Sequence, residues 1–420
     1  MKLHWQIFIA IGLAVVAGII TGEDAGIGSF VFYDAYVFVG TLFLNALKML
    51  IVPLILSSII CGIANMGELG GLGRLGGKTI TYYMSTSVIA ILIGLLLVNI
   101  VEPGIIDGEP VRDRVGLSEN IDEITAKVEG RGAGDIAGVF LRMVPTNIVA
   151  AAANGQMLGL IFFGLLFGYF MTKIEIEQRK TALLTFWNAV LDVMMKMTDW
   201  VMKFAPIGVF GLVAKVVAST GLDAFLPLAY FFFTVLGALL IHFAVVMPLL
   251  LKGLGRVQPL RHYKAMLPAL LTSFSTSSSS ATLPITMECV EKNAGVSNRT
   301  SSFVLPLGAT INMDGTALYE CVAAMFIAQA YGLHLGLTEQ FLIVITALVT
   351  SIGVAGIPAA SLVAISIILT TIGLPLEGIG LILAVDRVLD MCRTSVNVFS
   401  DSCGAVIIAR SEGEDQILRS

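Results

Sequence analysis

Residues 306–320 read PLGATINMDGTALYE, the most informative stretch of this chain. It lies inside an apolar segment, Phe303 to Ala330, that is long enough to cross a bilayer, yet it contains Asn312, Asp314 and Glu320. An ionised Asp near the bilayer centre costs roughly 2.5–3.5 kcal/mol on insertion scales. Acidic residues in membrane segments therefore usually face the protein interior and bind an ion, a substrate or another charged group. The stretch is therefore a poor lipid-facing anchor.

Two glycines, Gly308 and Gly315, accompany the amide and the acid in this stretch. Glycine lets the backbone open, and the freed carbonyl groups can then act as ligands. Open backbone at membrane depth is tolerated only where protein or a water-filled cavity surrounds it. The stretch predicts a cation site within a broken membrane helix.

The composition excludes a soluble globular domain. Of the 420 residues, 56% are hydrophobic and 13% charged, and the mean hydropathy is +0.90, so we expect a polytopic membrane protein. The net charge of -5 comes without clustered Lys and Arg, so no nucleic-acid partner is expected. The five cysteines fall singly in apolar stretches, and His242, His262 and His334 are scattered, a pattern typical of packing or surface residues rather than of a disulfide framework or zinc site.

The amino-terminal half contains apolar runs that are each long enough for a membrane helix of roughly 20 residues. These runs are Trp5–Gly22, Tyr36–Ala64, Tyr82–Val101, Val139–Met171, Ala182–Val217 and Phe225–Leu251. We interpret the first as a membrane span rather than a signal peptide, because no clear small-residue cleavage site follows it. The run from Val139 is interrupted by Pro145 and Gly155, so we expect it to enter the membrane in pieces.

Loop charge predicts the orientation. Basic residues lie near Arg74 and Lys78, at 173–180 and at 252–264, whereas residues 22–35 hold acids and no base. By the positive-inside rule both termini and these basic loops are cytoplasmic, in a cell membrane. The longest polar segment, Glu102 to Asp135, mixes both charge signs with Gly and Pro and is predicted to be an external, partly disordered loop.

Two apolar segments after residue 262 are interrupted near their middle. Tyr263–Val290 contains FSTSSSSATLP at Phe274–Pro284, and Phe341–Gly373 contains SIGVAGIP at Ser351–Pro358. Each half is too short to span, so both segments predict re-entrant helical hairpins around the broken helix, the layout of an inverted repeat with a midplane site. A serine run can also be a flexible linker, but its tight apolar flanks favour the hairpin.

The last span, Ile379 to Ala409, carries a second polar set. Five of its residues are spaced 4, 3, 4 and 4 and therefore share one helical face, with Thr394 at its border: Asp386, Asp390, Arg393, Asn397 and Asp401. These charges could pair among themselves, but three acids against one aligned base leave negative charge that a bound cation would balance. Arg387 lies off this face and receives no role.

The available ligands are carboxylates, amides, hydroxyls and carbonyls, which suit a small hard cation such as sodium. An arginine in a membrane interior pairs bidentately with carboxylate, so Arg393 indicates an anionic substrate that moves with cations. The hairpin tips, where helix amino termini converge, suit a second carboxylate.

Four motifs in this order carry a resemblance: SSSSATLP, GATINMDGTALYE, SIGVAGIP and DRVLDMCRTSVNVFSD. Together with MLIVPLILSS (Met49–Ser58), YYMSTS (Tyr82–Ser87) and VPTNIVAAAANGQMLGLIFF (Val144–Phe163), they resemble the excitatory amino acid transporter family, also called sodium:dicarboxylate symporters. The match covers essentially the whole chain.

The resemblance implies an all-α polytopic membrane protein with eight membrane helices, two re-entrant hairpins and inverted repeats, assembled as a homotrimer in lipid. It implies scaffold helices 1–2 at residues 1–64, a transport-domain helix at 65–101, an external loop with scaffold helices 4–5 at 102–218, and the rest of the transport domain at 219–420. The transport domain would move as an elevator, with the second hairpin as the external gate.

The resemblance further implies symport of sodium with L-aspartate or L-glutamate. Arg393 would hold the substrate side-chain carboxylate and Asp390 its ammonium group. Further substrate contacts would come from Ser279, Thr316, Ile357, Thr394 and Asn397. One sodium site would use Asp401 with backbone of Gly308, Asn312 and Asn397; a second would use Tyr83, Thr86, Ser87, Asn312 and Asp314; a third would use carbonyls of Thr310, Ser351 and Ile352.

Three positions bear on coupling. Relatives carry an auxiliary arginine either before the hairpin serines or in the last helix, where this chain has Ser277 and Met391. Glu320 matches members that countertransport protons and potassium, although a permanently protonated or hydrogen-bonded Glu is the alternative. Retained Asp401 favours sodium, and retained Arg393 favours acidic substrates.

Other functions stay open. A proton-coupled glutamate carrier or a C4-dicarboxylate carrier would share the fold, although Asp390 argues for a substrate with an amine. An ion channel could also line its pore with acids and hydroxyls. An intramembrane serine protease at Ser278 lacks a general base beside the serines, so we do not expect an enzyme.

Overall fold

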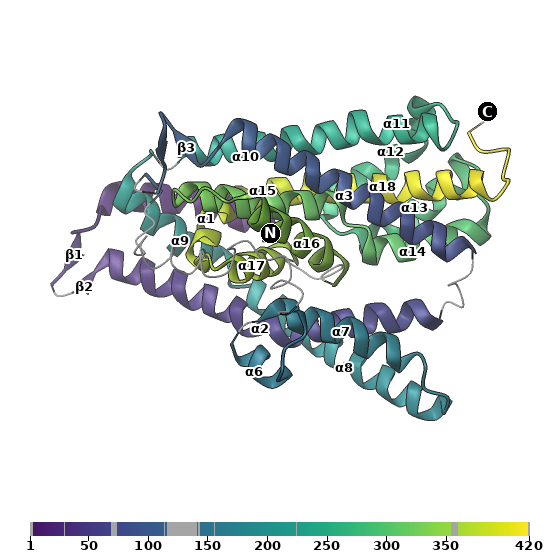
Figure 1. The fold of residues 1–420 in the computed structure, drawn as a ribbon. Helices are drawn as coiled ribbons and strands as arrows, with labels where there is room; N and C mark the ends of the chain where they lie inside the picture. The colour runs from purple at the N-terminus through teal and green to yellow at the C-terminus, as the bar shows by residue number, and fades with distance from the viewer. Residues whose placement is uncertain are drawn as a thin grey trace.

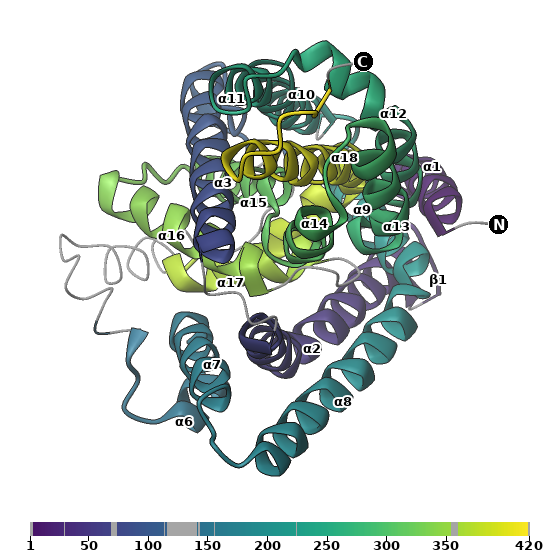
Figure 2. The ribbon, with the colours of Figure 1, turned by 90° about the vertical axis from the view of Figure 1, so that its right-hand side faces the viewer.

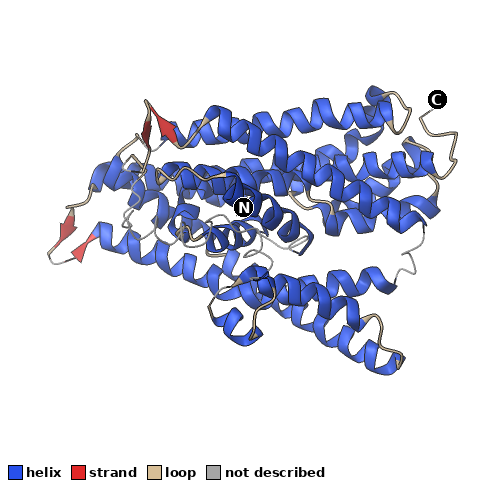
Figure 3. Ribbon diagram, viewed as in Figure 1, coloured by secondary structure: helices blue, strands red, loops and turns tan. Residues whose placement is uncertain are grey.

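The structure is a computed structural model of the chain. It describes residues 3–28, 30–68, 74–112, 114–115, 141, 143–154, 156–223, 225–353 and 360–418. Over these residues the chain is helical apart from two short antiparallel hairpins, which lie at the same end of the molecule (Figure 3). The predicted all-α architecture therefore holds except in two loops.

The hairpins pair β1 (Gly26–Ile27) with β2 (Phe30–Val31) and β3 (Ile105–Ile106) with β4 (Glu109–Pro110). The second forms within the predicted external loop because Asp107 and Gly108 make its turn, with φ of 57° and 81°. An Asp-Gly pair is the sequence signature of such a two-residue turn. The prediction of a partly disordered loop rested on the composition of the whole segment and did not consider this pair.

The helices of the amino-terminal half follow the predicted apolar runs (Figure 1). They are α1 (Leu3–Thr21), α2 (Phe32–Glu68), α3 (Arg74–Val101), α6 (Ile148–Ala153), α7 (Met157–Met171), α8 (Glu177–Met202), α9 (Ala205–Thr220) and α10 (Phe225–Ile241), the last continuing through the π-turn η1 (His242–Val246) into α11 (Met247–Gly253). The predicted interruption of the run from Val139 is confirmed by the separation of α6 from α7.

One predicted run is not a single helix. Ala182–Val217 is divided between α8 and α9, which are bent by 52° at the break. Pro206 lies at the start of α9. Proline is accepted in the first turn of a helix but clashes with the preceding turn in a helix interior, so the chain starts a new helix there.

Among the described residues, three helices are long and apolar enough to cross a membrane by length and composition: Phe32–Ala64, Arg74–Val101 and Phe225–Gly253. The bent pair of α8 and α9 makes a fourth if it counts as one span. Trp5–Thr21, Gly159–Met171 and Leu337–Ser351 are shorter apolar helices. The chain is therefore built as a multi-span membrane protein.

The segment around the opening stretch is broken as predicted. Helix α14 (Asn298–Ile311) ends at Asn312, whose backbone is extended with φ of -94° and ψ of 92°, and α15 (Asp314–Ala330) begins two residues later. Every residue of α15 is buried. The break therefore lies in the protein interior, where opened backbone is surrounded by polar partners rather than lipid.

The serine run makes a tight turn between two helices, not a flexible linker. Helix α12 (Pro259–Thr276) ends at Ser277 in the left-handed conformation, with φ of 52°. The Ser278 hydroxyl then accepts a hydrogen bond from the Ala281 N–H at 3.2 Å and caps α13 (Ser279–Glu288), which continues as η2 (Cys289–Asn293). Side-chain capping of this kind satisfies an otherwise unpaired helix N–H group.

The second interrupted segment forms α16 (Leu337–Gly353) and α17 (Ala360–Ile372), which pack on each other. The predicted tip between them, including Ile357, lies outside the described residues. After η3 (Leu376–Gly378), the chain ends in α18 (Ile379–Ser411).

The helices pack in two groups (Figure 2). In one group α18 runs through the centre and contacts α10, α12, α14 and α15, while α3 lies against α15. In the other, α9 packs on α1 and α2, and α7 and α8 pack on α2. The groups meet where α9 touches α18, where α16 touches α2 and where α17 touches α7.

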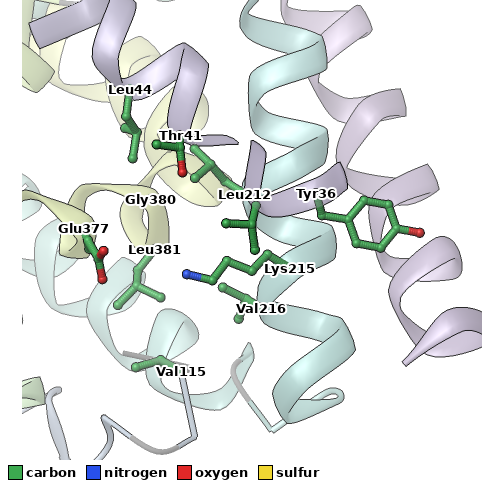
Figure 4. A pocket seen from close by; sticks show the side chains of 11 residues that line it. Tyr36, Thr41, Leu44, Val115, Leu212, Lys215, Val216, Glu377, Gly380 and Leu381 are labelled. Carbon is green, nitrogen blue, oxygen red and sulfur yellow. The ribbon is translucent and has the colours of Figure 1, made fainter. Parts of the chain in front are cut away.

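A pocket of about 50 Å³ lies at one of these meeting points, between α2, α9 and the start of α18 (Figure 4). Thr41 and Lys215 line it together with Glu377 and Leu381. Figure 4 shows the Lys215 side chain pointing toward the side that Glu377 and Leu381 line. Close packing is the norm inside proteins, so this void, whose lining is mainly apolar, marks a looser contact between the two groups of helices.

Candidate functional site

The break between α14 and α15 brings the first acid into a hydrogen-bonded cluster. Asp314 begins α15, where the helix dipole favours negative charge, and it is fully buried. Its Oδ1 accepts a hydrogen bond from the Ser87 hydroxyl at 2.7 Å, and its Oδ2 accepts one from the Ser400 hydroxyl at 2.6 Å. Helices α3, α15 and α18 therefore converge on one carboxylate.

His242 is a further partner, which no signal in the sequence indicated. Its Nε2 lies 3.1 Å from Oδ2 of Asp314, and both side chains are fully buried. This histidine is a buried packing residue, one of the two roles expected of it, and it lies at the start of the π-helix η1. His262 is also buried and lies 2.9 Å from the Ser402 hydroxyl.

Asn312 connects the hydrogen-bonded cluster around Asp314 to a second buried acid, Asp401. Its amide Nδ2 donates to Oδ1 of Asp401 at 2.9 Å and to the Ser400 hydroxyl at 3.0 Å. The Thr86 hydroxyl donates to the Asn312 Oδ1 at 3.3 Å. The predicted ligands of two sodium sites thus share one buried network.

Gly308 stands against this network because nothing larger fits. A Cβ there would lie 2.5 Å from Asp401 Oδ1 and 2.6 Å from the Tyr83 hydroxyl oxygen. The Tyr83 hydroxyl donates to the Val304 carbonyl at 2.7 Å, which leaves its oxygen able to accept a further contact. We infer that the requirement at this glycine is space for the carboxylate.

The remaining predicted sodium ligands are less central. The Thr310 side chain is exposed, and its hydroxyl donates to the carbonyl of Leu307 in its own helix at 2.9 Å. Ser351 is buried and its hydroxyl donates to the Leu348 carbonyl at 2.9 Å. Ile352 is the penultimate residue of α16. Among the described residues no cluster of three His, Cys, Asp or Glu side chains could hold a metal.

The predicted substrate arginine lies in a dense polar contact. Arg393 is 2% exposed, and its guanidinium lies 4.3 Å from the centre of the Tyr319 ring. Its Nη1 donates to Asp386 Oδ1 at 2.9 Å and its Nη2 to the Ser361 hydroxyl at 2.6 Å. Ser361, on α17, carried no signal in the sequence, whereas Tyr319 and Asp386 lay within recognised motifs without an assigned role.

Asp390 pairs with two arginines. Its Oδ1 lies 3.0 Å from Nη2 of Arg393, and its Oδ2 lies 3.1 Å from Nη1 of Arg387. Arg387 was given no role from its helical position, but its long side chain reaches the acid one turn later. Asp386 and Asp390 are thus balanced by two bases, so the excess negative charge expected on this face is confined to Asp401.

Asn397 joins the substrate side to the cation side. Its Oδ1 accepts a hydrogen bond from the Gly315 N–H at 2.7 Å, and its Nδ2 donates to the Thr316 hydroxyl at 3.0 Å. Thr316 and Thr394 are both buried, as is Ser279 at the start of α13. The described members of the predicted substrate set therefore come from α13, α15 and α18.

Glu320 is fully buried two turns into α15. Its Oε2 lies 3.1 Å from the Thr350 hydroxyl, and its Oε1 has no hydrogen-bond partner among the described residues. A carboxyl group this sparsely partnered is costly to keep ionised, so the site favours a bound proton or a cation.

Known proteins resemble this chain over nearly its whole length. The family profile described as Sodium:dicarboxylate symporter family matches residues 3–411. A proton/sodium-glutamate symport protein of Geobacillus stearothermophilus is 34% identical over 412 residues, which cover 98% of this chain and 95% of the relative. A proton/glutamate-aspartate symporter of Escherichia coli (strain K12) is 35% identical over 416 residues, covering 98% and 93%.

An animal protein matches as well. The excitatory amino acid transporter 3 of Homo sapiens is 36% identical over 456 residues, which cover 98% of this chain and 86% of the relative. These proteins are membrane transporters and not enzymes. The profile extends over the broken helix, helices α12, α13, α16 and α17 and the polar face of the last helix. This chain therefore belongs to the sodium:dicarboxylate symporter family.

Proposed function

We propose that this protein is a sodium-coupled symporter of acidic amino acids, L-aspartate or L-glutamate. The observation that carries the proposal is the single face of α18, on which the buried Arg393 and the buried Asp401 lie two turns apart with Asn397 between them. Arginine recognises a carboxylate, and a buried carboxylate without a basic partner calls for a cation.

The substrate would lie against the arginine end of this face. The side-chain carboxylate of the substrate would bind to the Arg393 guanidinium. In this structure the Nη groups of Arg393 donate to Asp386 and Ser361. The ammonium group of the substrate would take Asp390. Side chains of Thr316, Thr394 and Asn397 and the backbone of Ser279 and Ile357 would supply the remaining polar contacts.

Sodium ions would bind at the other end of this face of α18, near Asp401. The cluster of Asp314 with Ser87, and of Asn312 with Thr86, offers oxygen ligands from α3, α15 and the break between α14 and α15, and the Tyr83 hydroxyl adds one more. Asp401, with carbonyls of Gly308, Asn312 and Asn397, would form a second site. Carbonyls of Thr310, Ser351 and Ile352 would form a third.

Asn397 offers a physical route for coupling. A sodium ion that fixes Asn312 and Asp401 also fixes the break that Asn397 holds through Gly315 and Thr316. The substrate contacts at Thr316 and Asn397 are then pre-positioned, so sodium raises substrate affinity and, by linkage, substrate raises sodium affinity.

The proposal includes an elevator with eight membrane helices and two re-entrant hairpins, as the family resemblance implies. We assign residues 1–64 and 102–218 to the scaffold with its external loop, and 65–101 and 219–420 to the moving transport domain; the two packing groups support this division. The pocket beside Lys215 lies on the boundary that would slide. We also propose a homotrimer held by the scaffold.

The proposed orientation places both termini in the cytoplasm. The basic start of α3 contacts the carboxyl-terminal tail, where Lys78 binds Glu412 and Arg74 lies 3.4 Å from the same carboxylate. Arg261 donates to the Leu418 carbonyl at 3.0 Å. The basic loops and the tail therefore share one face of the molecule, as the positive-inside rule requires of a cytoplasmic face.

A second candidate is proton coupling, and Glu320 is the observation that favours it. Its Oε1 lacks a hydrogen-bond partner in a fully buried site among the described residues. A proton or a potassium ion carried on this carboxyl during the return step would add countertransport to the sodium-driven cycle.

The test is uptake of labelled L-aspartate into liposomes that hold the purified protein. A sodium gradient and a proton gradient are imposed separately, with internal potassium present or absent. Uptake that requires external sodium and disappears in Arg393→Cys supports the proposal. Uptake driven by a proton gradient alone refutes the sodium assignment of Asp314 and Asp401.

A further inference from the structure

Asp390 divides its two oxygens between two arginines. Oδ1 accepts from Arg393, with Nε at 3.2 Å and Nη2 at 3.0 Å. Oδ2 accepts from Nη1 of Arg387 at 3.1 Å. Each oxygen therefore has its own cation, and the oxygen that Arg393 leaves unused is the one that Arg387 takes.

The two contacts differ in accessibility. The Arg393 side chain is 3% exposed, whereas the side chains of Arg387 and Asp390 are each 25% exposed. Arg387 thus sits at the open edge of the cluster, where an incoming ligand can reach its contact with Asp390. Arg393 lies behind it, also bonded to Asp386 and Ser361.

The Arg387 contact is also incomplete. Its hydrogen bond to Asp390 uses Nη1, and its buried Nε has no hydrogen-bond partner among the described residues. Bidentate pairing is what makes an arginine–carboxylate contact strong and directional. A single-point contact with an unpaired donor beside it is easier to displace than the contact of Arg393, which places both Nε and Nη2 against Oδ1.

We propose that Arg387 is a specificity-determining residue that occupies Oδ2 of Asp390 until a substrate ammonium group replaces it. The inference rests on the proposed function, in which Asp390 receives the substrate amine. Arg387 then acts as an internal stand-in for that amine: it competes with an amino acid for Asp390, and it does not compete with a dicarboxylate that lacks an amine.

The charge balance gives the consequence of removing Arg387. With it, Asp386 and Asp390 are matched by two arginines, and an amine-free dicarboxylate can bind Arg393 beside a neutralised Asp390. Without it, Asp386 and Asp390 share Arg393 alone, and the remaining negative charge, beside the freed Oδ2, repels the dicarboxylate and attracts an ammonium group. The affinity for the amine-free dicarboxylate therefore falls, and the amino acid no longer competes with Arg387 for Asp390. Both effects increase the preference for an amino acid over an amine-free dicarboxylate.

The experiment uses the full-length protein in liposomes under a sodium gradient. It measures the ratio of the inhibition constant of succinate to the KM of L-aspartate, and the same two affinities by calorimetry in detergent, which does not depend on turnover. In Arg387→Met we expect the ratio to rise on the order of tenfold, the scale of one charge-assisted hydrogen bond. Arg387→Lys, which keeps the charge, should move the ratio less.

Arg179→Met is the matched control, because it removes one positive charge by the same substitution on the exposed part of α8. A ratio that stays flat or falls in Arg387→Met overturns the inference, as does an equal rise in Arg179→Met.

The proposed function fails separately. It fails if the wild-type protein does not bind L-aspartate in the presence of sodium. It also fails if Asp390→Asn weakens the binding of succinate as much as it weakens the binding of L-aspartate. When both of those tests are passed and Arg387→Met leaves the ratio flat, only the role of Arg387 is refuted.

Discussion

A single methyl group added at Gly308 probes the cation cluster directly. In Gly308→Ala the new Cβ would lie 2.5 Å from Asp401 Oδ1, 2.7 Å from its Cγ and 2.6 Å from the Tyr83 hydroxyl oxygen. Real Cβ contacts essentially never fall under 3.0 Å. The Asp401 carboxylate must therefore withdraw by about half an ångström or more, while the backbone of α14 gains helix propensity from the substitution.

The displacement falls on a hydrogen bond of the network. Asn312 Nδ2 lies 2.9 Å from Asp401 Oδ1, at the optimum for such a bond, so a shift of this size weakens it. Overpacking of this kind costs about 1–3 kcal/mol. If this cost destabilises the sodium-bound state, the sodium concentration for half-maximal uptake rises about 5-fold to 150-fold.

The assay is the sodium dependence of L-aspartate uptake in proteoliposomes. Gly237→Ala is the matched control, because its Cβ would meet Leu97 Cδ2 at 3.5 Å, an ordinary contact, in helix α10. Thermal unfolding without sodium shows whether each variant is folded. A half-saturating sodium concentration in Gly308→Ala within twofold of that in Gly237→Ala would refute the view that this glycine makes room for the Asp401 carboxylate.

Three further predictions concern other parts of the molecule. Arg393→Lys keeps the charge and loses the fork, so the KM for L-aspartate should rise at least about tenfold while calorimetric sodium binding without substrate stays within twofold; an unchanged KM would contradict the carboxylate role. Glu320→Gln should abolish any dependence of uptake on internal potassium and leave sodium-driven exchange of labelled for unlabelled substrate intact, and a persisting potassium dependence would remove Glu320 from the cycle. Burial raises the pKa of the Glu414 carboxyl, but hydrogen bonds from Ser297 and Thr300, each at 2.6 Å, outweigh this and hold the pKa below its usual 4.5. That stabilisation is present above about pH 4.5 and is lost as the pH falls through the lowered pKa, so Glu414→Gln should reduce Tm by about 2 °C at pH 7 and by less at pH 4; an equal reduction at both values would contradict it.

Features that depend on neighbouring residues could be predicted from the sequence. The break at Asn312 followed from polar residues and glycines inside an apolar run, and the turn at Ser277 and Ser278 followed from polar residues between short apolar halves. The spacing of Asp390, Arg393 and their neighbours placed them on one face, because a helix repeats every 3.6 residues. Local periodicity was enough for each of these.

Features that depend on distant segments were decided by the tertiary structure. His242 lies beside Asp314, 72 residues away, because α10, which runs directly into the π-helix η1 at His242, packs on α15. Ser361 reaches Arg393 from α17, 32 residues earlier in the chain. No pattern along the chain encodes which side chain fills the space opposite another.

The sequence by itself determined that this is a membrane protein with a polar interior, and its motifs predicted the family. Only the tertiary structure decided how the charges are paired: Asp386 with Arg393, Asp390 with both arginines, and Asp401 with an amide in place of a base. The reason is physical. Helical periodicity fixes the direction in which a side chain leaves its helix, but the pairing of a long arginine depends on its rotamer and on the helices packed against it.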